Sequence, residues 1–347
     1  MPVSIVVGGQ FGSEGKGKVS LDLVRTAKES DVTVVRVGGT NSGHTGYDRT
    51  GKKFALRQLP AACIDQNVDV VFPSGSYIDV NLLFEEISIL NYPTERIFIS
   101  EYARIITNQH RDWETGGKLI QAIGSTGSGV GAAVMSSIAR EARNFPLTSI
   151  LANEVNKLKP FWQDTTNYLR AKLASGGRVI IEGSQGFGLS LLDGGYWPKA
   201  TSRCTTAAAA LNEAGLSPLD VDKIYLVLRS YPIRVAGNSG KLVGELTWDE
   251  VAKRGGIELD LSEYTTVTKK LRRVGEFDAE QVRRAIYANN PTHIVMNHLD
   301  YIGTKSDLNT DSKLSRFLSK VECDLKRKID LMGFNPFDLI EKPVVAI

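Results

Sequence analysis

Gly8-Gly9-Gln10-Phe11-Gly12-Ser13-Glu14-Gly15-Lys16-Gly17-Lys18 is the stretch that decides the fold. The β-branched run Val3 to Val7 before it predicts a buried strand, and the apolar spacing from Gly15 to Arg25 predicts a helix. A strand, a glycine loop and a helix in that order are typical of phosphate binding, because backbone amides point at the anion from the start of the helix. The loop is not a Walker A motif, since Gln10 replaces its first glycine and Gly17 replaces its hydroxyl residue. A tight turn with solvent-facing lysines is the alternative.

Apolar runs farther along the chain predict more strands, separated by stretches with helical spacing. The predicted strands are Asp31 to Val37, Val68 to Phe72, Arg178 to Ile181, Ile224 to Leu228 and His293 to Met296. The predicted helices are Asn81 to Leu90, Leu151 to Leu173 and Ala279 to Ala288, with one or two charged surface helices in Asp307 to Met332. This alternation predicts an α/β fold whose largely parallel central sheet is flanked by helices. Without repeats or a linker, we expect one catalytic domain over residues 1–347 with peripheral helical lobes.

Three other segments combine glycines with polar side chains after such runs. They are Gly38 to Thr45, Ser125 to Gly131 and Glu182 to Gly186. Because ligands in open α/β sheets bind beyond the carboxyl ends of strands, His44 and Gln185 are candidates for chemistry there. The alternatives are a structural histidine, an ordinary flexible loop and a polar strand cap.

The amino-acid composition limits the kinds of molecule that the protein is expected to bind. The net charge of +3, with 42% apolar and 23% charged residues, is ordinary for a globular protein and favours no nucleic acid partner. The short basic cluster at residues 269–273 suits phosphates or carboxylates better than long polyanions. The three cysteines lack paired spacing, and neither a signal peptide nor a membrane span is evident, so we expect a cytoplasmic protein without a membrane partner.

The four loops, in this order, resemble the adenylosuccinate synthetase family. That family carries Gly-Asp-Glu-Gly-Lys-Gly-Lys, then Gly-His-Thr, Thr-Gly-x-Gly-x-Gly and Glu-Gly-x-Gln-Gly. The matching segments here are Gly12 to Lys18, Gly43 to Thr45, Thr126 to Gly131 and Glu182 to Gly186. Thr201-Ser202-Arg203-Cys204-Thr205-Thr206 also resembles the family's Thr-Ser-x-x-Thr-Thr. The resemblance covers about residues 4–300 and implies a P-loop-like nucleotide-binding fold.

The resemblance implies a carbon–nitrogen ligase that phosphorylates a purine 6-oxygen with a nucleoside triphosphate and Mg²⁺. The amine of L-aspartate then displaces phosphate. By resemblance, His44 hydrogen-bonds or protonates the leaving or bridging oxygen, Gln185 stabilises the 6-phosphorylated purine, and Ser13 stands at the catalytic base position. The implied triphosphate site is Gly12, Ser13, Glu14, Gly15, Lys16, Gly17, Gly43, His44, Thr45, Asn297 and Asp300. The implied purine monophosphate site is Ser13, Asn41, Ser125, Thr126, Arg140, Gln185 and Thr201. The implied metal ligands are Ser13 and the Gly43 carbonyl.

Ser13 is the main departure, since the family has an aspartate there that acts as base on purine N1 and as magnesium ligand. A hydroxyl is a poor base near neutral pH, but its smaller volume leaves room for the 2-amino group of guanine. The change resembles the viral branch of the family, which makes 2-amino-2'-deoxyadenylosuccinate from dGMP for 2-aminoadenine DNA. The alternatives are an IMP-using and GTP-using synthetase, or a nucleotide-binding switch that performs no ligation.

Two further sites depart from the family. Its Thr-Thr-Gly-Arg-x-Arg segment for aspartate is replaced here, and the implied aspartate site is Thr266, Val267, Thr268, Lys270 and Arg272. A solvated basic face is the alternative. Its guanine-reading lysine is replaced by His298 and its C-terminal Gly-Pro is absent, which favours ATP as donor. Arg140 matches an arginine lent across a dimer interface, so the resemblance implies a homodimer.

Overall fold

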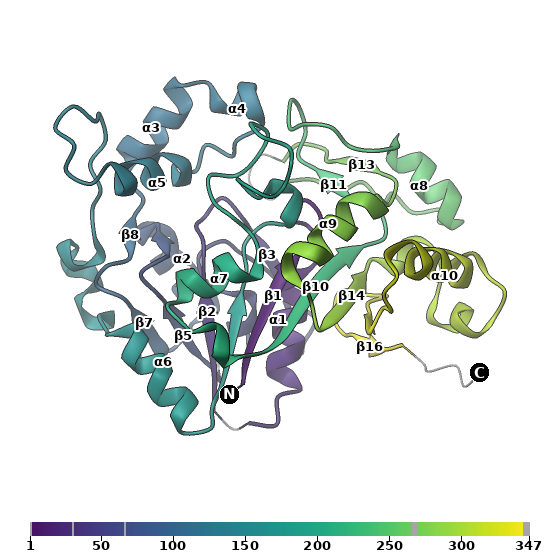
Figure 1. Cartoon of the computed structure of the whole chain (residues 1–347), viewed down its shortest axis with the longest axis horizontal. Coiled ribbons are helices and arrows are strands. Elements are labelled where there is room, and N and C mark those ends of the chain that lie inside the picture. The colour runs from purple at the N-terminus through teal and green to yellow at the C-terminus, as the bar shows by residue number, and fades with distance from the viewer. Residues whose placement is uncertain (1, 30, 66, 266–268, 343–347) are drawn as a thin grey trace.

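The central sheet organises the whole chain. The computed structural model describes residues 2–29, 31–65, 67–265 and 269–342. They form a nine-stranded sheet in the order β16-β15-β14-β10-β1-β9-β2-β5-β7 (Figure 1), in which the β15–β16 pair alone is antiparallel. Its strands are β1 (Val3–Gly8), β2 (Val32–Arg36), β5 (Asp69–Phe72), β7 (Ile97–Ile99), β9 (Arg178–Glu182), β10 (Val221–Arg229), β14 (His293–Asn297), β15 (Leu331–Met332) and β16 (Ile340–Glu341). The predicted α/β fold is confirmed, and β1 lies in the middle of the sheet with the first glycine loop at its end.

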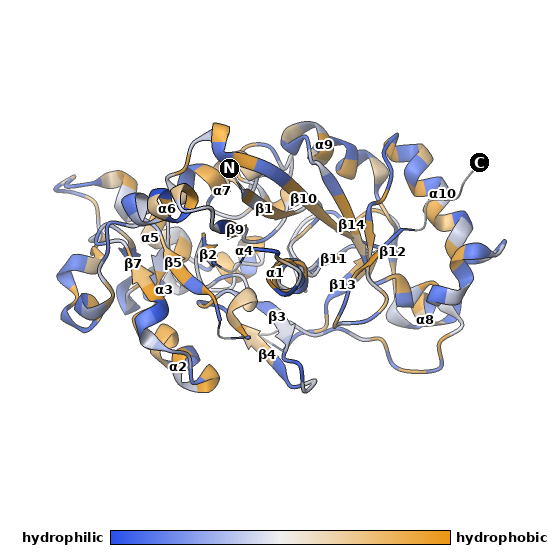
Figure 2. Ribbon diagram, turned by 90° about the horizontal axis from the view of Figure 1, so that it is seen from below, coloured by the Kyte–Doolittle hydropathy of each residue, from blue (hydrophilic) through white to orange (hydrophobic). Residues whose placement is uncertain are grey.

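Both faces of the sheet are covered, because successive side chains of each strand point to opposite sides. In β1, Val6 packs into a cluster with residues of α1 and α2, whereas Ile5 and Val7 pack with residues of α6, α7, α9 and α10. Figure 2 shows these apolar strands between the surrounding helices. Strands buried on both faces have continuous apolar runs, which is why the sequence revealed them.

The helices that cover these faces and build the lobes are α1 (Lys16–Arg25), α2 (Val80–Leu90), α3 (Asn108–Gly116), α4 (Leu119–Ile123), α5 (Val130–Ala139), α6 (Thr165–Ala174), α7 (Ala207–Ala214), α8 (Trp248–Gly255), α9 (Ala279–Asn289) and α10 (Lys313–Leu325). Each apolar side chain of Leu or Ile size that they bury stabilises the fold by roughly 1.5–3 kcal/mol.

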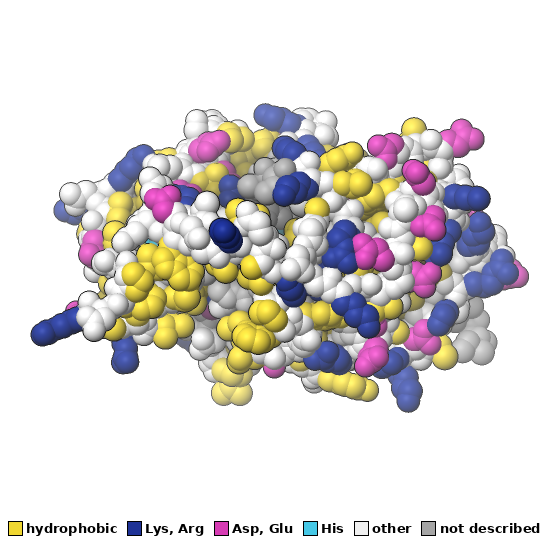
Figure 3. Space-filling model, turned by 90° about the horizontal axis from the view of Figure 1, so that it is seen from above, with side chains coloured by type: hydrophobic (Ala, Val, Ile, Leu, Met, Phe, Trp, Pro, Cys, Tyr) yellow, Lys and Arg dark blue, Asp and Glu magenta, His cyan; other side chains and the backbone are white. Residues whose placement is uncertain are grey.

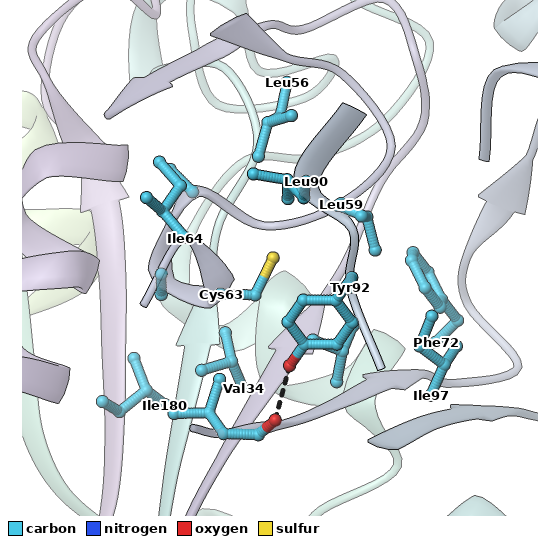
Figure 4. Packing of buried hydrophobic residues seen from close by; sticks show 14 of the residues in the cluster. Val34, Leu56, Leu59, Cys63, Ile64, Phe72, Leu90, Tyr92, Ile97 and Ile180 are labelled. Atoms are coloured by element: carbon cyan, nitrogen blue, oxygen red, sulfur yellow. Dashed lines mark hydrogen bonds between the residues drawn. The ribbon is translucent and has the colours of Figure 1, made fainter. Parts of the chain in front are cut away.

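The cluster on the α1 side includes a buried cysteine. Figure 4 shows Cys63 among apolar side chains, and beside it the Tyr92 hydroxyl donates a hydrogen bond to the Val68 carbonyl at 2.5 Å. Burial raises the pKa of the Cys63 thiol well above its usual range. Cys63 therefore serves as a small apolar core residue rather than as a reactive thiolate.

One predicted helix is wrong. Leu151 to Leu173 was expected to be continuous, but two short 3₁₀ turns, Ala152–Glu154 and Asn156–Phe161, precede α6. Pro160 lies in the second turn and has no N–H to continue a helix. A new helix then begins at Asp164, whose carboxylate caps it by accepting from the Asn167 N–H at 3.1 Å.

The charged stretch Asp307 to Met332 contains one α-helix, α10, as expected; a 3₁₀ turn at Lys305–Asn309 precedes it, and the stretch ends in β15 rather than in a helix. The helix is amphipathic, with Leu314 and Leu318 buried against the core. Among the described residues, no helix has the length and apolarity needed to cross a membrane.

Three small sheets lie outside the central one. The first is the antiparallel pair β3 (His44–Tyr47) and β4 (Lys53–Leu56), and the second is the parallel pair β6 (Tyr77–Ile78) and β8 (Arg104–Ile105). The third has the order β11 (Ile233–Arg234), β13 (Arg273–Gly275) and β12 (Glu245–Leu246). Figure 1 shows this third sheet and the α3–α5 helices on opposite sides of the upper part of the molecule.

Candidate active site

A cavity of about 850 Å³ lies beyond the carboxyl ends of the central strands. Ser13 follows β1, Asn41 follows β2 and Gln185 follows β9, and all three line it. Residues of α3–α5 form one wall, and residues 234–239 form another. Figure 3 shows the face that carries these lobes, where apolar patches lie between mixed positive and negative side chains. The volume is within the usual range for a small-molecule site.

The cavity separates the predicted residues into two groups. The lining contains Gly12, Ser13, Asn41, Gly43, Ser125, Thr126, Gln185, Thr201, Lys270 and Arg272. The described predicted residues outside that lining are Glu14, Gly15, Lys16, Gly17, His44, Thr45, Arg140, Asn297 and Asp300. Thr266, Val267 and Thr268, predicted to bind aspartate, lie outside the described residues. The cavity thus brings together the residues predicted for the purine monophosphate, except Arg140, with Lys270 and Arg272 of the predicted aspartate site, whereas most of the predicted triphosphate residues lie apart from it.

The first glycine loop closes around its own carboxylate. Glu14 accepts hydrogen bonds from the Gln10 N–H at 3.1 Å and the Gly12 N–H at 2.7 Å. Its other oxygen pairs with Lys16 Nζ at 3.0 Å, and both side chains are buried. The loop turns at Gly15, whose φ of 91° is accessible to glycine at little cost. Two loop amides therefore face an internal anion in this structure.

Asn297 fastens this loop to the neighbouring strand. Its Nδ2 donates to the Glu14 carbonyl at 2.9 Å, and its Oδ1 accepts from Lys18 Nζ at 3.2 Å. Lys18 also donates to the Asn335 carbonyl at 2.7 Å, and burial lowers its pKa to about 8. The Asn297 amide, predicted to read a donor base, is thus bonded at both ends within the protein, while Asp300 lies exposed.

His44 is the first residue of β3 and is buried beside two charged side chains. Its Nδ1 lies 2.5 Å from Glu182 Oε1, at the end of β9. Glu182 also accepts from the Ala61 N–H at 3.0 Å and lies 3.6 Å from Arg36 Nη1. Sequence reasoning did not assign a site role to Glu182 or Arg36.

The charges around His44 fix its protonation state. Burial, followed by the Arg36 guanidinium, lowers the pKa of His44 to about 4. Burial acts to raise the pKa of Glu182, but His44 and Arg36 bring it to about 2. A neutral imidazole therefore faces an ionised carboxylate, which can only accept, so Nδ1 carries the proton and Nε2 is the acceptor, with Arg36 Nη1 and Ser42 Oγ each 3.4 Å away.

Two predicted monophosphate-site amides point unpaired acceptors into this region. Asn41 Nδ2 lies 3.3 Å from Thr201 Oγ1, while its Oδ1 is buried without a partner among the described residues. Gln185 has a φ of 59°, and its buried Oε1 also lacks a partner there. A buried polar atom without a partner costs roughly 1–3 kcal/mol, and such strain collects at functional sites. Both oxygens are therefore available to a ligand.

The charged lining of the cavity is mostly basic. Its described basic residues are Lys199, Lys270, Arg234 and Arg272, and its single described acidic residue is Glu114. That carboxylate is already hydrogen-bonded within the protein, because it accepts from the Gly129 and Gly131 N–H groups, each at 2.8 Å, at the start of α5. The cavity therefore suits anionic ligands, and its single described carboxylate already accepts two hydrogen bonds from the protein.

Ser13 is held from both sides. Its Oγ accepts a hydrogen bond from Arg272 Nη1 at 2.8 Å, and its carbonyl accepts from Arg229 Nη1 at 3.1 Å. Because an arginine only donates, the Ser13 hydroxyl keeps its hydrogen and one lone pair for other partners. The structure thus joins the first loop to the predicted aspartate segment.

Arg140 lies apart from all of these groups. It follows α5, is exposed, and has a φ of 57°. Its predicted place in a partner's monophosphate site stays a prediction.

Sequence reasoning also missed Arg234. Its guanidinium lies 4.3 Å from the Phe11 ring centroid and 5.0 Å from that of Tyr196, and it donates to the Lys199 carbonyl at 3.1 Å. Burial lowers its pKa to about 10. No glycine motif marks this position, but its place soon after β10 was a usable signal, since cavity residues follow strand ends.

The two predicted metal ligands fit a weakly held magnesium ion. Among the described residues, no group of three or more His, Cys, Asp or Glu side chains could hold a metal. Magnesium in phosphoryl-transfer sites takes one or two protein oxygens, with phosphates and water completing the shell. Ser13 and Gly43 both line the cavity, and the Ser13 hydroxyl retains a lone pair. They are the residues that would hold the ion.

Comparison with known proteins decides the family. The family model described as adenylosuccinate synthetase matches residues 5–155 and 146–310. The adenylosuccinate synthetase of Pyrococcus sp. (strain ST700) is 33% identical over 346 residues, covering 97% of this chain and 96% of the relative. The chain belongs to the adenylosuccinate synthetase family. Membership makes it a carbon–nitrogen ligase of purine biosynthesis, and the family generally uses Mg²⁺.

Other relatives of the adenylosuccinate synthetase family support the assignment. That of Thermococcus onnurineus (strain NA1) is 36% identical over 304 residues, covering 86% of this chain and 84% of the relative. The solved Plasmodium falciparum adenylosuccinate synthetase shares the fold, with a TM-score of 0.84, 23% identity and coverage of 99% and 100%. The cyanophage S-2L succinoaminodeoxyadenylate synthetase, solved with dGMP and dATP, has a TM-score of 0.81, 28% identity and coverage of 99% and 96%. The resemblance to the viral branch is thereby confirmed.

Proposed function

We propose that this chain joins L-aspartate to C6 of dGMP with hydrolysis of ATP. The products are 2-amino-2'-deoxyadenylosuccinate, ADP and phosphate, and the pathway supplied is 2-aminoadenine DNA synthesis. The observation that carries the proposal is the Ser13 hydroxyl, which lines the cavity where the family has a carboxylate. The similar cyanophage protein, solved with dGMP and dATP, supports both the purine and an adenine donor.

Serine suits a guanine substrate on grounds of volume and charge. A carboxylate paired to N1 crowds the 2-amino group beside it, whereas a hydroxyl is smaller. With one lone pair left after accepting from Arg272, Ser13 can also accept from that amine. The basic lining attracts the substrate phosphate and the aspartate carboxylates.

The reaction has two steps. In the first, purine O6 bonds to the γ-phosphorus while the γ-phosphorus–oxygen bond to ADP breaks, and the N1 proton is released to water. In the second, the aspartate nitrogen bonds to C6 while the C6–O6 bond breaks and phosphate leaves, and the amine releases a proton. Mg²⁺, when bound, offsets charge on the transferring phosphoryl group. Gln185 contributes its side-chain amide beside the 6-oxygen.

His44 needs a proton before it can donate one. In the resting protein Nδ1 carries the proton toward Glu182, and Nε2 is an acceptor 3.4 Å from Arg36 Nη1 and from Ser42 Oγ. Negative charge developing beside Nε2 favours protonation, and ionised Glu182 then stabilises the imidazolium, as carboxylates do for catalytic histidines. His44 is thus poised to bond to the bridging or leaving oxygen.

The remaining assignments complete the proposal. Gly12, Glu14, Gly15, Lys16, Gly17, Thr45, Asn297 and Asp300 contribute to the triphosphate site. Asn41, Ser125, Thr126 and Thr201 contribute to the monophosphate site, with Arg140 supplied by the other subunit of a homodimer. Exposure of Arg140 outside its own cavity supports that exchange.

Adenylosuccinate synthesis from IMP and GTP is the second candidate, favoured by the names of the curated relatives and by exposed Asp300. The test incubates purified protein with L-aspartate, Mg²⁺ and each of dGMP, GMP and IMP, with ATP, dATP or GTP, and resolves products by mass. A succinylated product from dGMP supports the proposal. A product from IMP alone refutes it.

A further inference from the structure

Among the described residues, Arg272 finds hydrogen-bond partners for one end of its guanidinium only. Its Nη1 donates to Ser13 Oγ at 2.8 Å and lies 3.6 Å from Glu263 Oε2. Its Nε is buried and has no partner among the described residues, and its Nη2 makes no hydrogen bond to them either. The Nε–Nη2 edge of a guanidinium is a fork that matches a carboxylate with two parallel hydrogen bonds. Arg272 lines the cavity with this edge unpaired.

Glu263 is the ion-pair partner of the bonded end, 3.6 Å from Arg272 Nη1. Its carboxylate accepts from Arg229 Nη2 and Nη1, and the Tyr301 hydroxyl donates to it at 3.0 Å. Burial acts to raise the pKa of Glu263, but Arg229 first, then His298 and Arg272, lower it to about 2. The carboxylate is therefore ionised near neutral pH.

Hydrogen bonds to backbone carbonyls also connect Arg272 to Glu263 and Arg229 to the first glycine loop. The Arg272 N–H donates to the Glu263 carbonyl at 2.8 Å. Arg229 ends β10, is 1% exposed, and donates to the Ser13 carbonyl as well. Glu263 thus lies between the buried Arg229 of the central sheet and the side chain of Arg272. Both of these arginines also donate to Ser13 in the first glycine loop.

We propose that Glu263 is a positioning residue that orients Arg272 so that its unpaired edge receives a carboxylate of the amino-acid substrate. This inference rests on the proposed function, since it assumes L-aspartate as that substrate. Glu263 is not among the cavity-lining residues and acts through Arg272. Pre-orienting the guanidinium removes the entropy cost of ordering it when substrate binds.

The test compares Glu263→Gln with wild type by calorimetric titration of L-aspartate, in the presence of dGMP and ADP. The variant should bind L-aspartate about tenfold or more weakly, because a charge-assisted contact that orients Arg272 is lost. Its affinity for dGMP should stay within about twofold, and its KM for L-aspartate should rise more than its kcat falls. The matched control is Glu245→Gln, which removes the carboxylate bonded to neighbouring Arg273 at 2.6 Å. The control should bind both ligands as wild type does.

Each other outcome overturns the inference. Wild-type affinity of Glu263→Gln for L-aspartate overturns it alone and leaves the proposed function standing. Equal weakening for dGMP and L-aspartate indicates a merely structural residue. Wild type that neither binds L-aspartate nor forms product refutes the inference and the proposed function together.

Removing one partner of a buried ion pair can unfold a protein, so a second variant is needed. Glu263→Gln combined with Arg229→Gln restores the charge balance. It should still bind L-aspartate about tenfold more weakly than wild type, because Arg272 still lacks the Glu263 carboxylate beside its Nη1. Wild-type affinity in the double variant contradicts the role.

Discussion

Replacing Ser13 by aspartate should shift substrate use from dGMP toward IMP. The Ser13 hydroxyl lies 2.8 Å from Arg272 Nη1 at the cavity wall. A carboxylate at this position forms an ion pair with the same guanidinium, in which the acceptor as well as the donor carries a charge. The new side chain is therefore held in place, and it cannot turn away from a guanine 2-amino group.

The expected loss of kcat/KM for dGMP follows from this restraint on the introduced carboxylate. Overpacking a well-ordered site costs roughly 1–3 kcal/mol, and each 1.4 kcal/mol is tenfold in rate or affinity. We expect kcat/KM for dGMP to fall about tenfold to hundredfold in Ser13→Asp. IMP lacks the 2-amino group and gains a base near N1, so its kcat/KM should rise.

The assay is phosphate release that depends on L-aspartate, with dGMP and IMP varied separately. Ser13→Ala is the control, since it removes the hydroxyl without adding bulk or charge, and it should reduce dGMP use by less than Ser13→Asp does. Unchanged dGMP turnover in Ser13→Asp would refute the crowding argument.

Three further predictions concern His44 and the first loop. His44→Ala should lower kcat roughly 10²–10⁴-fold in single-substrate kinetics, as expected for a general acid–base group; wild-type turnover contradicts a catalytic role. The folded-state pKa of His44 is about 4, below the usual 6.5, so its contribution to stability is present above pH 6.5 and is lost as pH falls toward 4. Denaturant titrations at pH 7 and 4.5 should therefore show a loss on the order of 3 kcal/mol that shrinks in His44→Ala, and an equal loss in that variant counts against the assignment. Gly333→Ala should cost roughly 1–3 kcal/mol and lower Tm, because its Cβ would collide with Asn297 Oδ1 and Lys18 Nζ. Gly116→Ala meets nothing within 4 Å and is the control; equal Tm values for the two variants contradict the collision.

The strands of the central sheet were predictable because they are buried on both faces. Val3–Gly8 and His293–Asn297 are largely buried on both faces, so their apolar runs stand out in the sequence. The lobes were not predictable in this way. Strands of two or three residues such as Ile233–Arg234 carry too few side chains to show a period, and Pro160 broke a helix whose apolar spacing continued beyond it.

The position of the cavity was predictable from the sequence, but the hydrogen bonds between its residues were not. Glycine loops after strands marked Asn41 and Gln185, because strand ends meet at one edge of a sheet. The partners of His44 could not be inferred, since Glu182 lies 138 residues away and meets it only when β9 and β3 pack together. Likewise, Ser13 and Arg272 are 259 residues apart, and only the fold shows that they share a hydrogen bond.

The measurement that tests the central claim most directly is a competition between dGMP and IMP in one reaction. Both are supplied at equal concentration with limiting L-aspartate, Mg²⁺ and ATP, and the two succinylated products are quantified by mass. We predict that the product from dGMP exceeds that from IMP at least tenfold. An excess of the IMP product would contradict the account, because it would show that Ser13 does not select guanine.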